Sequence, residues 1–149
     1  MVDLSTTIGN IPLSSCIYNA SGPRTGSSAA MSKITASASG GVLAKSATVA
    51  SQTGNDQPRT WHEENGQASL NSEGLPNNGI DYYIDPKTIA DTMGDSSKPY
   101  MVSISGKTLA DNMLMLGKIA EAVNNPDNRI SAIELNLACP NIGKISTDD

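Results

Sequence analysis

The spacing of apolar residues changes along the chain between two periods, which predicts that strands and helices alternate. Between residues 130 and 137, apolar side chains alternate with Glu134 and Asn136, and this is the period of an extended strand. Between residues 109 and 123, apolar side chains recur at spacings of four, three, four and three, which predicts a helix. The residues on this predicted helix face are Leu109, Met113, Leu116, Ala120 and Val123.

Turn and capping residues indicate the limits of the other elements. Asp85-Pro86 and Gly94 predict a helix over residues 86–93 with Asp85 as its N-cap. Thr108 and Asp111 resemble a capping box at the start of the longer helix. The remaining expected elements are a hairpin around Gly9-Asn10, a strand at 16–18, a helix over 28–34, a strand at 42–44, a hairpin that pairs 58–61 with 67–70, and a strand at 100–104.

Strands that alternate with helices indicate parallel βαβ units. Four of the expected strands end in polar or glycine-bearing loops, at residues 19–22, 45–46, 103–106 and 136–141. This layout is typical of the carboxyl-end face of a (β/α)8 TIM barrel, where active sites lie, although a complete barrel needs about 250 residues. We therefore expect an α/β fold in which residues 1–149 form the N-terminal half of such a barrel, preceded by a small β-hairpin. The C-terminal half is expected to be absent from this chain.

Composition narrows the classes of partner. The chain has 149 residues, a net charge of −5 and a pI near 4.7, which argues against nucleic acid or an anionic membrane as partner. It contains no run of 18 apolar residues and begins with no basic and then apolar signal pattern. Cys16 and Cys139 lie far apart, so we expect reduced thiols in a cytoplasmic protein. The single His and the two cysteines form no local cluster of metal-ligating residues, so the sequence predicts no metal site.

Three polar stretches carry the candidate chemistry. Cys139 follows a predicted strand and lies between Asn136 and Asn141, whose carboxamides offer donors and acceptors to a planar polar ligand. The alternative for Cys139 is a buried structural thiol. Lys45 ends a buried strand, so its ammonium group either extends to solvent or faces an anionic or electron-rich ligand. Residues 71–77 are dense in amides, with a hydroxyl and a glycine, and could surround a polar ring.

Taken together, these stretches resemble the class 1A dihydroorotate dehydrogenases, which are cytosolic, FMN-dependent (β/α)8 barrels. The resemblance covers nearly the whole chain, and the motifs occur in the family's order. They are Asn19-Ala20-Ser21-Gly22, Ala44-Lys45-Ser46-Ala47-Thr48, Gly54-Asn55 with Pro58-Arg59, residues 71–77, Gly79-Ile80-Asp81-Tyr82-Tyr83 and residues 134–141.

The resemblance implies a reaction, the oxidation of dihydroorotate to orotate in pyrimidine biosynthesis, by a homodimeric enzyme. It makes Cys139 the base that removes the C5 proton of dihydroorotate. Hydride then passes from C6 to N5 of FMN, and fumarate reoxidises the flavin. The positions implied to bind substrate are Lys45, Asn71, Ser72, Glu73, Gly74, Leu75, Asn136 and Asn141, and those implied to bind FMN are Ala20, Ser21, Gly22, Lys45, Ser46 and Asn136.

Three departures from the family pattern bear on the substrate site. Glu73 stands where the family has Met, and we expect its carboxylate to point to solvent, because an inward carboxylate would repel orotate. Ala138 replaces a Ser, and residues 142–145 replace a Val-Pro-Gly-Lys-Pro run. Two alternatives stay open: a truncated, non-catalytic half-barrel that acts as a binding or assembly module, and a flavin enzyme for another pyrimidine.

Overall fold

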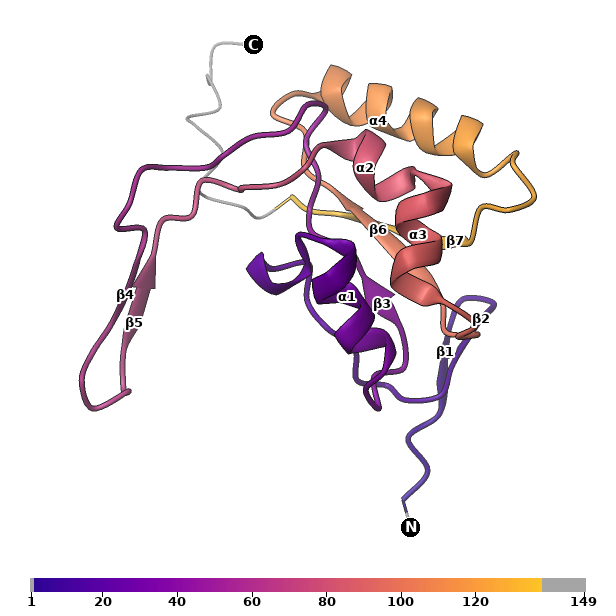
Figure 1. The fold of residues 1–149 in the computed structure, drawn as a ribbon, viewed down its shortest axis with the longest axis horizontal. Helices are drawn as coiled ribbons and strands as arrows, with labels where there is room; N and C mark the ends of the chain where they lie inside the picture. Colours follow the sequence, from indigo (N-terminus) through magenta and orange to yellow (C-terminus); the bar gives the residue numbers. More distant parts are fainter. Residues whose placement is uncertain (1, 138–149) are drawn as a thin grey trace.

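The protein folds around one parallel sheet, from which two small hairpins project (Figure 1). The computed structural model describes residues 2–137. In chain order the elements are β1 (Thr6–Ile8), β2 (Ile11–Leu13), the 3-10 helix η1 (Pro23–Thr25), α1 (Ser28–Thr35), β3 (Val42–Leu43), β4 (Thr60–His62), β5 (Ser69–Asn71), α2 (Ile80–Ile84), α3 (Pro86–Met93), β6 (Tyr100–Ile104), α4 (Leu109–Ala122) and β7 (Ile130–Leu135).

The two faces of the central sheet differ in polarity. Its strands lie in the order β3-β6-β7, and both neighbouring pairs are parallel. The register pairs Ser103 with Glu134, and Val102 with Ile133. Because successive side chains of a strand point to opposite faces, one face carries Ser103 and Glu134 and the other carries Val102 and Ile133. The apolar face packs against the helices, and the opposite face is polar near the strand ends.

Aliphatic, methionine and tyrosine side chains fill the core between the sheet and the helices, because the chain contains no Phe. Tyr83 and Tyr100 are both fully buried. The Tyr100 hydroxyl donates to the Tyr83 carbonyl at 3.0 Å, and the Tyr83 hydroxyl donates to the Gly26 carbonyl at 3.1 Å. Both phenols thus find the hydrogen-bond partner that a buried Tyr requires.

Local capping explains why the predicted helix starts are confirmed. Asp85 accepts a hydrogen bond from the Thr88 backbone at 2.8 Å, and α3 covers the predicted residues. Thr108 and Asp111 form a complete capping box at the start of α4. The hairpin β1-β2 turns at Gly9-Asn10 as predicted. Within the described residues, no helix is long and apolar enough to span a bilayer.

The helix predicted over residues 109–123 is confirmed as α4, but the apolar residues that predicted it do not form its most buried side. Met115 and Ile119 are buried against the core, whereas Leu109 and Met113 are exposed. Apolar side chains occur on more than one side of this helix, so spacing alone does not identify the side that meets the sheet. Part of the exposed side borders an apolar groove that α4 forms with β7.

The strand expected at residues 16–18 is absent, so the parallel sheet of the described residues has three strands rather than four. The reason is visible at Asn19. Its carboxamide nitrogen donates to the Leu43 carbonyl at 2.7 Å, and its oxygen accepts from the Leu43 N–H at 3.0 Å. A side chain therefore occupies the β3 groups that the backbone of a neighbouring strand would pair with.

The hairpin predicted across Asn65-Gly66 exists, but its strands lie about two residues further along the chain than expected. It projects away from the sheet (Figure 1), and every residue of β4 and β5 is exposed. Helix α2 was not predicted, because a five-residue helix is too short to show a helical period. Its Tyr83 packs in the core.

Candidate functional site

Polar side chains from four separate segments meet at the carboxyl ends of the parallel strands. Ser21 comes from the loop before η1, Ser46 follows β3, Ser103 lies in β6, and Asn136 follows β7. Ser46 and Ser103 are almost fully buried, at 1% and 0% exposure. We call Ser21, Ser46, Ser103, Glu134 and Asn136 the serine cluster.

Ser46 is the centre of the serine cluster. Its hydroxyl lies 3.0 Å from Ser21 Oγ, 2.9 Å from Ser103 Oγ and 3.0 Å from Asn136 Nδ2, which donates to it. The Asn136 backbone N–H donates to the Ile104 carbonyl at 2.9 Å, so the residue continues the sheet by one position. Parallel pairing thus brings residues 90 positions apart in sequence into direct contact.

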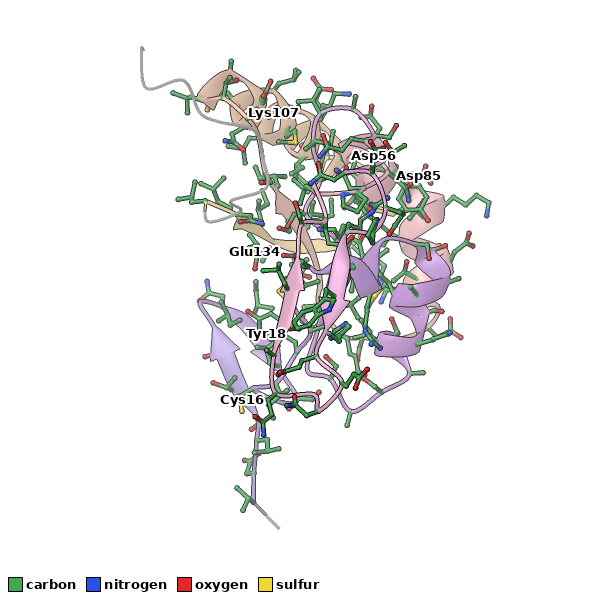
Figure 2. All side chains as sticks on the ribbon, turned by 90° about the vertical axis from the view of Figure 1, so that its left-hand side faces the viewer. Cys16, Tyr18, Asp56, Asp85, Lys107 and Glu134 are labelled. Carbon is green, nitrogen blue, oxygen red and sulfur yellow. The ribbon has the colours of Figure 1, made fainter. Side chains whose placement is uncertain are left out.

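Glu134 lies on the same face of β7 as Asn136, two residues before it. Its Oε1 accepts from Ser21 Oγ at 2.6 Å and from Ser103 Oγ at 2.7 Å. Figure 2 labels Glu134 beside the ribbon of β7. Sequence reasoning gave Glu134 no role of its own, although its i, i+2 relation to Asn136 places both on one strand face.

Lys45 is buried, with 5% exposure, and its Nζ donates to the Ser21 carbonyl at 3.3 Å. The structure therefore excludes the interpretation in which the ammonium group extends to solvent. Lys is almost never buried without a compensating group, and the Ser21 carbonyl is one such partner at the edge of the serine cluster. Ser21 joins the two charged residues, because its carbonyl binds Lys45 and its hydroxyl binds Glu134.

The predicted substrate loop, residues 71–75, has an unusual backbone that side chains outside it hold in place. Gly74 and Leu75 have φ values of 68° and 54°, and a positive φ is uncommon for a residue other than Gly. Gln52 Nε2 donates to both of their carbonyls at 2.9 Å. A Cβ at position 74 would lie 2.5 Å from Asn55 Oδ1, so only Gly fits there.

Glu73 does not point freely to solvent, and that expectation is wrong. Its Oε1 accepts from Thr60 Oγ1 at 2.6 Å, and its Oε2 lies 3.8 Å from Arg59 Nη1. The carboxylate thus binds the base of the β4-β5 hairpin. The sequence separation of 13 residues hid this contact, because the hairpin turn has to form before the two residues meet.

The structure therefore brings some of the expected site residues together and leaves others apart. Ser21, Lys45, Ser46 and Asn136 meet at the serine cluster, with Ala20 and Gly22 flanking Ser21 along the chain. Most of the hydrogen bonds that hold the 71–75 loop run to residues 52–60, and Asn71 and Ser72 are exposed. Sequence reasoning assigned no role to Gln52 or to Asn55, which fix this loop.

Two expected site residues, Cys139 and Asn141, lie outside the described residues. The other cysteine, Cys16, is exposed and lies near the β1-β2 hairpin, well below Glu134 in the view of Figure 2. Among residues 2–137, no group of three or more His, Cys, Asp or Glu side chains could hold a metal ion.

Comparison with known proteins assigns the family. A family model described as "Dihydroorotate dehydrogenase" matches residues 3–147. The dihydroorotate dehydrogenase A (fumarate) of Lactococcus lactis is 37% identical over 139 residues, which are 93% of this chain and 42% of the relative. The dihydroorotate dehydrogenase (fumarate) of Trypanosoma brucei is 38% identical over 110 residues, or 74% of this chain and 33% of the relative.

The fold comparison gives the same architecture. A crystal structure of the Eimeria tenella dihydroorotate dehydrogenase in complex with ferulenol superposes with a TM-score of 0.69 at 19% sequence identity. The match covers 96% of this chain and 38% of the other chain. This chain thus has an α/β fold that corresponds to part of a TIM barrel, and it spans less than half the length of the relatives that it matches.

Proposed function

The chain belongs to the dihydroorotate dehydrogenase family, and from that premise we propose that it supplies the N-terminal half of an FMN-dependent barrel that oxidises dihydroorotate to orotate. The observation that carries this proposal is the meeting of Lys45, Ser46 and Asn136 at the carboxyl ends of neighbouring parallel strands. Active sites of (β/α)8 barrels lie at this end of the strands. Fumarate as final acceptor is part of the proposal, because the relatives' names contain it.

The residues around the serine cluster fit a flavin. Gly22 has open space where a side chain would lie, and Ala20 is exposed, so the backbone of residues 20–22 is open to a ligand. Asn136 and Ser46 offer the donors and acceptors that a flavin ring pairs with. When bound, FMN supplies the chemistry of accepting a hydride from C6 of dihydroorotate.

In the proposed reaction, the chain's own residues orient the substrate and move its proton. The buried Lys45 ammonium group stabilises the negative charge of the substrate carboxylate and of the reduced ring. The 71–75 loop, held by Gln52 and Asn55, presents backbone and amide groups to the pyrimidine. Cys139, as the thiolate, removes the proton from C5.

The assignment of Cys139 is tested in a chimera in which this chain replaces the matching segment of the Lactococcus lactis relative. We expect Cys139→Ala to abolish the oxidation of dihydroorotate, measured as orotate formation, because no other thiol takes the proton. Cys16→Ala is the matched control, since Cys16 is exposed and lies well below Glu134 in the view of Figure 2. If Cys139→Ala retained the turnover of the Cys16→Ala chimera, the base would be another group.

The same proposal includes a cytoplasmic homodimer that takes small-molecule substrates. The β4-β5 hairpin supports it, because the cross-strand pair of Trp61 and Leu70 is exposed at 56% and 71%. An isolated two-stranded hairpin is marginally stable in water, and exposed aromatic side chains are enriched at protein interfaces.

A further inference from the structure

We propose that Glu134 is a positioning residue, which sets the direction of the hydrogen bonds in the serine cluster and thereby holds the Asn136 carboxamide in one orientation. The inference deepens the proposed function, and its relevance to FMN rests on that function. Its geometric part rests on the hydrogen bonds of the described residues alone.

The first step is the convergence of two hydroxyl groups on one oxygen. Ser21 Oγ and Ser103 Oγ come from different segments, yet both lie within 2.7 Å of Glu134 Oε1. A carboxylate has no proton to give, so each serine must donate its only hydroxyl hydrogen to Glu134. Hydrogen bonds to a charged acceptor are shorter and stronger than neutral ones, which agrees with these two distances.

The second step fixes Ser46. The hydrogens of Ser21 and Ser103 are both used on Glu134, so neither serine can donate to Ser46. The Ser46 hydroxyl must therefore donate its single hydrogen to Ser21 at 3.0 Å or to Ser103 at 2.9 Å. Its lone pairs are then left as acceptors for other groups.

The third step fixes Asn136. When the Ser46 hydrogen points to Ser21 or Ser103, the Ser46 oxygen can only accept a hydrogen bond from Asn136. It can then bind the amide nitrogen of Asn136 but not the amide oxygen. Asn136 Nδ2 does lie 3.0 Å from Ser46 Oγ. A flip of the carboxamide would either place two acceptors against each other or draw the single Ser46 hydrogen away from both Ser21 and Ser103. Through the serines, Glu134 thus favours the observed directions of Asn136 Oδ1 and Nδ2.

The proposal predicts different effects of two substitutions. Glu134→Gln keeps an acceptor oxygen for both hydroxyls, so the direction of the hydrogen bonds is retained. Glu134→Leu has similar bulk but no acceptor, so Ser21 and Ser103 can donate to Ser46 instead and compete with Asn136. Glu121→Leu is the control, because it removes an exposed carboxylate of α4.

The measurement is the hydrogen exchange of the Asn136 side-chain amide by NMR in the 149-residue chain, with the signal identified by its loss in Asn136→Asp. We expect exchange in Glu134→Leu to be faster by about tenfold, the effect of about one lost hydrogen bond. Glu134→Gln and Glu121→Leu should keep the wild-type rate. Circular dichroism shows whether each variant keeps its fold.

Two results would overturn the proposal. If Glu134→Leu kept the wild-type rate, the carboxylate would not orient Asn136. If Glu134→Gln exchanged as fast as Glu134→Leu, the charge and not the acceptor would matter.

Adding FMN to the chimera with the Lactococcus lactis relative tests the link to function. In this chimera, Glu134→Leu should weaken FMN binding and Glu134→Gln should not. A wild-type chimera that binds no FMN would overturn the proposed function, while the NMR result would still decide the role of Glu134.

Discussion

Single residues of the site differ in how far the sequence reveals them. Lys45 could be singled out, because a Lys at the end of a buried strand is rare, and the structure confirms that it is buried. Glu134 could not, because alternation in a strand does not say which face lies inside. In this sheet the apolar positions Ile133 and Leu135 are half exposed, and the polar positions face the serine cluster.

Asn77 carries much of the polar pairing beneath the 71–75 loop. It is buried at 7% exposure, and its Oδ1 accepts from the backbone N–H groups of Thr48 at 3.1 Å and Gly79 at 2.8 Å. Its Nδ2 donates to the Leu75 carbonyl at 2.9 Å. The sequence showed Asn77 only as one of the amides of residues 71–77, because its partners are fixed by tertiary contacts.

We expect Asn77→Ala to lower the free energy of unfolding by about 2–4 kcal/mol, since it leaves buried backbone groups without partners. Urea unfolding followed by circular dichroism measures the change. Asn124→Ala is the matched control at an exposed asparagine after α4, and it should change the free energy by less than about 0.5 kcal/mol. Equal values for the two variants would show that Asn77 is not needed for stability.

Among the elements, helix limits were easier to predict than helix faces. Asp85, Gly94 and Thr108 act within one turn of the chain, so their capping roles are readable from local sequence. The buried side of α4 depends on the sheet that it meets, and local spacing contains no such information. Likewise, the hydrogen bond between Thr108 and Asp111 could be predicted, because the two residues are three positions apart. The hydrogen bond between Thr60 and Glu73 could not, because these residues meet only across a hairpin.

The capping box of α4 gives a prediction at the scale of one element. Thr108 Oγ1 accepts from the Asp111 N–H at 3.1 Å, and Asp111 Oδ2 accepts from the Thr108 N–H at 3.1 Å. We expect Thr108→Ala to destabilise the chain by about 1 kcal/mol, measured by urea unfolding. Ser97→Ala, at an exposed serine outside any helix, should have almost no effect. A Thr108→Ala variant as stable as the Ser97→Ala variant would show that the cap does not stabilise α4.

For the whole molecule, the sequence predicted the fold class and the structure confirms it. Parallel strands, helices on one face and the Eimeria tenella superposition all correspond to part of a TIM barrel. The strand count was not predictable, because Asn19 satisfies the outer groups of β3 with a side chain. Ile133 and Leu135 on the helix-facing side of β7 remain half exposed beside the apolar groove with α4.

The two buried tyrosines predict how stability depends on pH. Burial raises the pKa of Tyr83 to about 12, and burial likewise raises the pKa of Tyr100 above its ordinary value. The unfolded chain loses these protons near pH 10, before the folded chain does. The contribution of these two phenols to the free energy of unfolding is therefore fully present below about pH 10. It falls as the pH rises towards 12, by up to about 1.4 kcal/mol per pH unit for each tyrosine.

Urea unfolding at pH values from 8 to about 12 measures this slope. Tyr83→Phe should make the slope shallower, because one of the two phenols is removed. Tyr18→Phe is the control, since Tyr18 is 38% exposed, and its slope should match the wild type. A Tyr83→Phe slope equal to that of the wild type would show that Tyr83 is not the group that titrates.

The central proposal is that this chain supplies the N-terminal half of an FMN-dependent dihydroorotate dehydrogenase barrel. It is tested most directly by the flavin absorbance of the purified chimera with the Lactococcus lactis relative, expressed as FMN per chain. The account predicts one FMN per chain in the chimera, and none in the 149-residue chain alone. A folded chimera without FMN, or turnover of dihydroorotate by the 149 residues alone, would contradict it.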